Sequence, residues 1–130
     1  MNRIQLLDKY PVFVEEIAKS DTDCAGVDDV VARLHAKVQA HAGASEIAVF
    51  DHLAHVRAQA DGKVAEGIRA SKHLLFCLSN AIPNALICAV RPRAVSIVET
   101  DDRFVISWLE APVEAPNQVI AGWVESLRRT

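Results

Sequence analysis

The spacing of hydrophobic residues changes along this 130-residue chain, and it constrains the fold more than any other feature. Between Val27 and Val38, apolar residues recur three or four positions apart, which predicts a helix with one apolar face. Shorter segments on either side alternate apolar and polar side chains or are rich in β-branched residues, as strands are. A chain in which these two periods interchange is expected to pack helices on a sheet.

Several segments are predicted to be strands, with helices between some of them. Residues 46–51 carry apolar side chains on both faces, which indicates a central place in the sheet. Pro83 is expected to open a short helix that reaches about residue 90, and the last helix is expected to follow a loop over residues 112–116. Residues 52–70 fit either a short helix or extended chain. The predicted strands are residues 12–17, 46–51, 73–79, 94–99 and 104–109.

These elements predict a single α+β domain over residues 1–130. The expected order is β-α-β-(α)-β-α-β-β-α, with helices packed on a mostly antiparallel sheet of about five strands. Hydrophobic residues make up 51% of the chain but aromatic residues only 5%, so the surplus is aliphatic. Strands that are apolar on both faces need cover, and a few short helices do not supply it all. The surplus therefore predicts a subunit interface and a homo-oligomer, expected to be a dimer.

Charge and cysteine content exclude several classes of protein. The net charge of −3 argues against a surface that binds nucleic acid through phosphates, and the apolar-rich composition excludes a disordered chain. The three cysteines lie far apart without a Cys-x-x-Cys pair, which excludes a disulfide scaffold and indicates a reduced, cytoplasmic setting. No window of about eighteen uncharged apolar residues occurs, and the N-terminus lacks the pattern of a secretory signal, so no membrane partner is expected.

The sequence Asp51-His52-x-x-His55, here called the Asp-His segment, is the most suggestive cluster of chemical groups. If a helical turn follows the strand, His52 and His55 lie on one face, and two imidazoles with a carboxylate are ligands that zinc or iron accepts. The alternative is that Asp51 caps the following turn and the histidines make ordinary hydrogen bonds. No cofactor is predicted, and zinc or iron is the alternative. His73 is a further candidate member of the cluster.

Arg91 and Arg93 form the second candidate site. They lie on the same side of an extended segment just before a strand, where two guanidinium groups could hold a carboxylate or a phosphate. The alternative is that both arginines pair with acidic residues such as Glu99, Asp101 or Glu110. If this pair and the Asp-His segment face one cleft, the cleft would suit a small anionic ligand.

The middle of the chain resembles a known family. An Asp-His pair ends one strand, and a strand that reads Leu-Leu-Phe-Cys-Leu-Ser-Asn follows at residues 74–80, where the family has Leu-Leu-x-Phe-Gly-Asn-Pro. A proline then leads into a strand ending at Glu99, and a hairpin ends before Pro112. This order is similar to the bacterial family called domain of unknown function 302, or to a closely similar uncharacterised bacterial family. The likeness covers residues 25–112, although Ser79-Asn80-Ala81 stands where that family has Gly-Asn-Pro. The resemblance implies a compact α+β fold that often self-associates, and it implies no known reaction.

The sequence therefore favours a noncatalytic domain that self-associates and binds a small anionic ligand near the Asp-His segment and the two arginines. It lacks a Gly-x-Ser-x-Gly elbow and a glycine-rich phosphate loop, which argues against the commonest hydrolases and nucleotide binders. One alternative is a small metal-dependent enzyme built on Asp51, His52 and His55. The other is a protein-interaction module with a different protein as its partner.

Overall fold

A computed structural model describes residues 1–130, and its centre is a six-stranded sheet in which every neighbouring pair of strands is antiparallel. The strand order is β1-β2-β6-β5-β4-β3, so β1 and β3 are the two edges. The strands are β1 (Asn2–Leu6), β2 (Tyr10–Ala18), β3 (Ser45–Asp51), β4 (Ala70–Cys77), β5 (Arg93–Glu99) and β6 (Arg103–Leu109). The helices are α1 (Val27–Ala40), α2 (His52–Arg57) and α3 (Glu114–Glu125), with the short 3-10 helices η1 (Lys19–Asp21) and η2 (Leu86–Val90).

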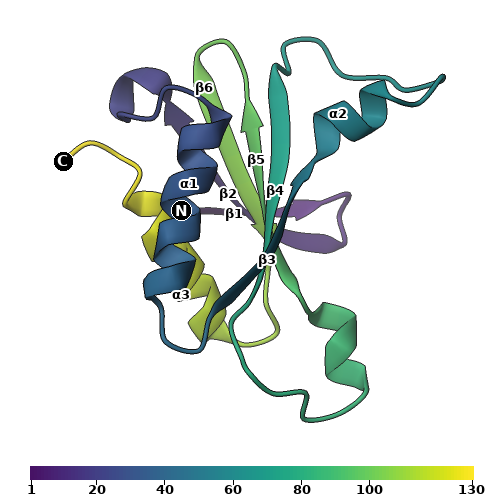
Figure 1. The fold of residues 1–130 in the computed structure, drawn as a ribbon, viewed down its shortest axis with the longest axis vertical. Helices are drawn as coiled ribbons and strands as arrows, with labels where there is room; N and C mark the ends of the chain where they lie inside the picture. Colours follow the sequence, from purple (N-terminus) through teal and green to yellow (C-terminus); the bar gives the residue numbers. More distant parts are fainter.

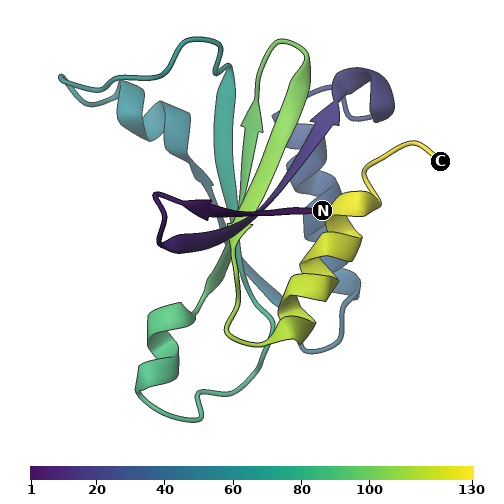
Figure 2. The ribbon, with the colours of Figure 1, turned by 180° about the vertical axis from the view of Figure 1, so that it is seen from behind.

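Helices α1 and α3 cover one face of this sheet (Figures 1 and 2). The apolar stripe predicted between Val27 and Val38 is buried against it, and the alternating strand residues Leu74 and Phe76 point into the same core. Trp123 of α3 meets the ring of Phe76 edge-on, with ring centroids 5.5 Å apart. One hydrophobic core therefore lies between the sheet and its two long helices.

The opposite face of the sheet is covered by neither of these helices. In Figure 2, α1 and α3 lie to the right of the sheet, while the β1–β2 hairpin, α2 and η2 project to its left. Strand register places Phe50, His73, Ser96, Ser107 and Val14 in one row across this second face. None of these side chains is fully buried. A face of this kind agrees with the predicted subunit interface, and self-association stays a prediction.

The predicted α+β class and antiparallel sheet are confirmed, but the sheet has six strands rather than about five. The extra strand is β1, whose residues are all exposed and therefore carry no pattern of burial. The turn that joins it to β2 uses Leu7 and Asp8 at positive φ, 53° and 60°, where the usual sequence signal is glycine or asparagine. Because Leu7 is not a usual turn residue, this hairpin could not be recognised from the sequence.

The predicted central place of residues 46–51 is wrong, because β3 is an edge strand and all of its residues are exposed. Apolar side chains on both faces of a strand also suit an edge, provided that one side lies against solvent or another molecule. Two helix boundaries differ as well. Pro83 does not open the short helix, which begins at Leu86, and α3 begins at Glu114 inside the segment predicted to be a loop. None of the helices is both long and apolar enough to cross a membrane.

Candidate functional site

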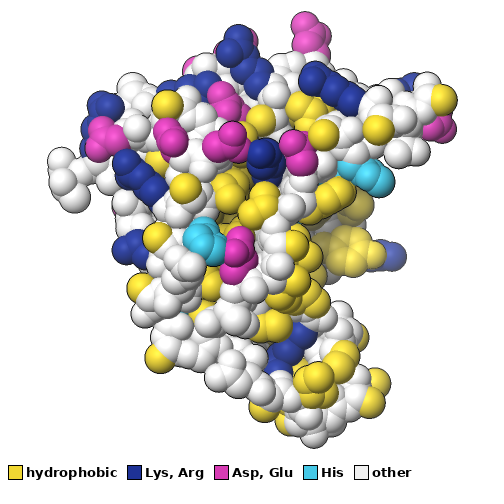
Figure 3. All heavy atoms as spheres, in the orientation of Figure 1, with side chains coloured by type: hydrophobic (Ala, Val, Ile, Leu, Met, Phe, Trp, Pro, Cys, Tyr) yellow, Lys and Arg dark blue, Asp and Glu magenta, His cyan; other side chains and the backbone are white.

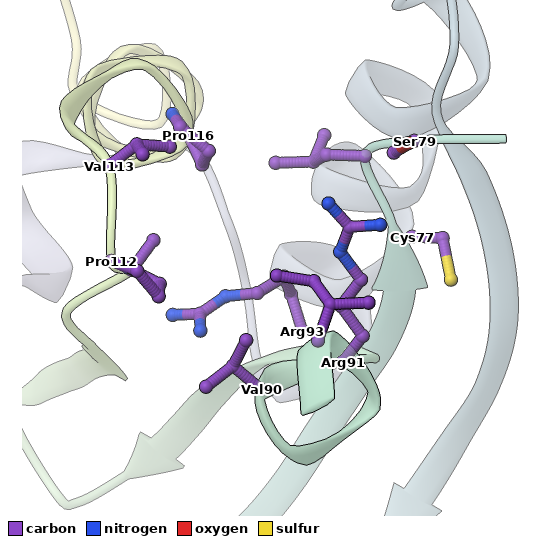
Figure 4. A pocket seen from close by; sticks show the side chains of 11 residues that line it. Cys77, Ser79, Val90, Arg91, Arg93, Pro112, Val113 and Pro116 are labelled. Carbon is purple, nitrogen blue, oxygen red and sulfur yellow. The ribbon is translucent and has the colours of Figure 1, made fainter. Parts of the chain in front are cut away.

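The structure forms a pocket around the two arginines, here called the arginine pocket, with a volume of about 180 Å³. It lies between the start of α3, the end of β4 and the segment that contains η2. Figure 4 shows both guanidinium groups turned into it, that of Arg93 towards Pro112 and that of Arg91 towards Ser79. The lining residues are Cys77, Leu78, Ser79, Ile87, Val90, Arg91, Arg93, Ala111, Pro112, Val113 and Pro116.

Arg93, the first residue of β5, is the buried cation of this pocket, and only 9% of its surface is exposed. One of its terminal nitrogens, Nη2, donates a hydrogen bond to the backbone carbonyl of Leu109. Its Nε is buried without any hydrogen-bond partner. Burial lowers the pKa of the Arg93 guanidinium, because a cation loses its hydration there. The group still carries its charge at neutral pH, since a guanidinium loses its proton only in strong alkali.

Arg91 lies at the other side of the arginine pocket, and its Nη1 donates to the carbonyl of Ala81 at 2.8 Å. Neither arginine forms an ion pair. The three acidic residues that the sequence offered as partners bind other cations: Glu99 binds Lys19 at 2.8 Å, Asp101 binds Arg69 and Glu110 binds Arg3. The alternative in which these residues neutralise the arginine pair is therefore not what the structure shows.

A buried amide holds one wall of the arginine pocket in place. Asn117 in α3 is 1% exposed, and its Oδ1 accepts a hydrogen bond from the N–H of Ala111 at 2.8 Å. Its Nδ2 donates to the carbonyls of Ala111 and Val113, both at 3.3 Å. These bonds fix the backbone between β6 and α3, and this backbone carries Pro112 and Val113 into the pocket. Sequence reasoning missed Asn117, whose only signal was a polar residue on an otherwise apolar helix face.

The Asp-His segment lies at the end of β3, and its Asp51 caps the following helix, which is the alternative to a metal site. The Asp51 carboxylate accepts a hydrogen bond from the backbone N–H of Ala54 at 2.9 Å, which caps α2. His52 Nδ1 lies 3.0 Å from His73 Nε2, so the two imidazoles share a hydrogen bond. The Phe50 ring packs beside both of them, with ring centroids 5.4 and 5.8 Å away. His55 meets the same ring edge-on.

The residues of the Asp-His segment do not fit a metal ion as a set. No three His, Cys, Asp or Glu side chains in the structure come together in a way that could hold one. The carboxylate of Asp51 is occupied by the cap, and the nitrogens of His52 and His73 face each other. A catalyst that uses Asp51, His52 and His55 with zinc or iron stays a prediction, and the geometry favours the structural role of these residues.

The two candidate clusters lie apart. Asp51 pairs with Lys72 at one end of β4, whereas Arg93 pairs with Phe76 at the other end, and four residues of strand span roughly 13 Å. His52 lines a separate hollow beside α2. His52 and the arginine pair therefore line separate hollows, although His73 and Arg93 both border a third hollow on the second face of the sheet. The arginine pocket is the stronger candidate site.

His73 gives a prediction about pH. Burial, and then the charge of neighbouring His52, lowers the pKa of His73 in the folded protein. As the pH falls through about 6.5, the unfolded chain takes up a proton at this residue before the folded protein does. The stabilisation that the neutral His73 ring gives the folded protein is therefore fully present above that pH and is lost as the pH falls below it. We expect His73→Gln to flatten the fall in stability between about pH 7.5 and pH 5, measured by urea denaturation at each pH.

The matched control for His73 is His55→Gln, because the ring of His55 has no hydrogen bond and touches the same Phe50 ring. This variant leaves the contact between His52 and His73 in place, so the fall in stability that His73 causes should remain. An unchanged pH profile in His73→Gln would contradict the assignment.

Comparisons with known proteins add a family but no activity. The family model described as "Family of unknown function (DUF6858)" matches residues 1–129 of the chain. No curated protein and no solved structure matches. The likeness to domain of unknown function 302 stays a prediction, since the matching model is that of a different family.

Proposed function

We propose that the chain, which belongs to DUF6858, a family of unknown function, is a binding protein for a small anion held in the arginine pocket. The observation that carries this proposal is Arg93, a nearly buried cation without a carboxylate partner. Moving a charge out of water without a counter-charge is costly, and buried arginines are normally paired for that reason. An anion bound beside Arg93 would supply the missing partner.

The remaining surroundings of Arg93 support this reading. The arginine pocket contains no Asp or Glu, so no acidic side chain competes with an incoming anion. Arg91 adds a second positive charge to the same pocket. Figure 3 shows hydrophobic side chains gathered at the lower right, over η2, with basic side chains next to them, while the acidic side chains in this view lie further up. The lining of the pocket is therefore basic and apolar, which favours an anion there.

The pocket supports binding rather than catalysis. Its lining includes the Cys77 thiol and the Ser79 hydroxyl, but no His, Asp, Glu or Lys that could act as a general base for either. Ser79 Oγ already accepts a hydrogen bond from the N–H of Ala81 at 3.2 Å. A nucleophile without a base within reach is weakly activated, so a reaction at this site has little support.

The experiment is a thermal-shift titration of the purified protein with sulfate, phosphate, acetate and benzoate, at constant ionic strength set with sodium chloride. At least one of these anions should raise Tm in a saturable way. Arg93→Met should weaken the binding of that anion by at least about tenfold, and Arg91→Met should weaken its binding less. Arg57→Met serves as the control, because Arg57 is an exposed arginine of α2 outside the pocket.

Two outcomes would overturn the proposal. One is that none of the anions stabilises the protein beyond the effect of chloride. The other is that the stabilisation survives unchanged in Arg93→Met. Circular dichroism of each variant would first establish that it is folded.

A further inference from the structure

Resting on the proposed function, we infer that the ligand of the arginine pocket is a carboxylate with a compact apolar body rather than a phosphate. The carboxylate binds Arg93, and the body lies against the apolar wall formed by η2 and the start of α3. The inference depends on how donors and apolar groups are distributed in the pocket, on its missing backbone donors and on its size.

The pocket combines hydrogen-bond donors with apolar side chains. The guanidinium groups of Arg93 and Arg91 enter it from two sides, and the Ser79 hydroxyl accepts a hydrogen bond but keeps its own proton free to donate. The lining also includes Ile87 and Val90 with Val113 and Pro116, which donate nothing from their side chains. A ligand that uses both kinds of group has a charged end and an apolar end.

The pocket lacks the cradle of backbone N–H groups that phosphate sites use. Such sites are typically built from glycine-rich turns or the free N–H groups of a helix start. No glycine lines this pocket, and the two prolines at its α3 side, Pro112 and Pro116, have no N–H to offer. A doubly charged phosphate would therefore lose more hydration than these groups replace.

The size of the pocket limits the body of the ligand. A volume of 180 Å³ is close to that of a cavity of about 150 Å³ that holds one benzene molecule. It is below the usual range for drug-sized ligands, roughly 300–1,000 Å³, so most of a nucleotide or a long acyl chain would lie outside this pocket. A phenyl ring or a short branched chain with one carboxylate is of the right order.

The test is isothermal titration calorimetry with four probes that separate charge from shape: benzoate, phenyl phosphate, benzyl alcohol and acetate. We expect benzoate to bind at least about tenfold more tightly than phenyl phosphate, acetate and the neutral benzyl alcohol. Arg93→Met should remove benzoate binding. Val90→Ser should weaken the binding of benzoate but leave the binding of acetate unchanged, because only benzoate has a ring that would lie against Val90. Arg57→Met should bind as the wild type does.

The outcomes separate this inference from the proposed function. If phenyl phosphate binds as tightly as benzoate or more tightly, and this binding needs Arg93, the inference fails and anion binding stands. If acetate binds as tightly as benzoate, the apolar wall is not used and the inference fails. If no anion binds, or if benzyl alcohol binds as tightly as benzoate, both the inference and the proposed function fail.

Discussion

Phe76→Ala is expected to lower the free energy of unfolding by about 3–5 kcal/mol, a large part of the roughly 5–15 kcal/mol that a domain of this size has. Phe76 is fully buried in β4 and packs against Trp123 of α3. Its removal leaves a cavity between the sheet and that helix, and it also removes the transfer free energy of an aromatic ring. Urea denaturation followed by tryptophan fluorescence measures the change, and the variant is expected to be only marginally folded at 25 °C.

The control is Leu75→Ala, the neighbouring residue on the other face of the same strand, which is only half-buried. Leu75→Ala should lower the free energy of unfolding by less than half as much as Phe76→Ala, since the Leu75 side chain borders solvent. An equal loss in the two variants would contradict this picture, and it would mean that a partner covers the second face in solution.

Asn117→Ala is expected to lower the free energy of unfolding by about 2–4 kcal/mol, the second large effect. The amide satisfies three backbone groups between β6 and α3, and alanine would leave the two buried groups of Ala111 without partners. The cost of such orphaned groups exceeds the net value of the hydrogen bonds themselves. Thermal and urea unfolding of the variant would both show it.

Gln118→Ala is the matched control for Asn117. Gln118 is the next residue on α3, it is exposed, and its amide bonds only to Glu114 one turn away. Its replacement should change stability by less than about 0.5 kcal/mol. A loss in Asn117→Ala no larger than that of this control would refute the structural role of the buried amide.

Much of the fold could be predicted because its signals are local. The stripe of α1 and the alternation of Leu74 and Phe76 reflect the periods of a helix and a strand, and each is readable within one short segment. The edge position of β3 could not be read in the same way. An apolar strand has the same sequence pattern at the centre of a sheet as at an edge that faces solvent or a partner. Only its pairing with strands far away in the sequence distinguishes the two positions.

The candidate site was predictable only in part. Arg91 and Arg93 stood out because two guanidinium groups so close together are unusual. Their freedom from ion pairs depends on competing cations far away in the sequence, since Arg3, Lys19 and Arg69 hold the acidic residues that sequence reasoning had offered. The wall fixed by Asn117 likewise forms only when α3 packs against the sheet and meets the segment that follows β6.

The unpaired guanidinium of Arg93 also has a consequence for how much of this protein a cell would hold. If the proposed anion binds there, the empty folded chain bears an unpaired buried charge that the unfolded chain exposes to water, so the empty form unfolds more often. A ligand at one hundred times its Kd adds about 2.7 kcal/mol to the folded state. Proteases remove unfolded chains, and a difference of this size alters abundance several-fold. The amount of protein would then follow the supply of its anion, without any separate control of its synthesis.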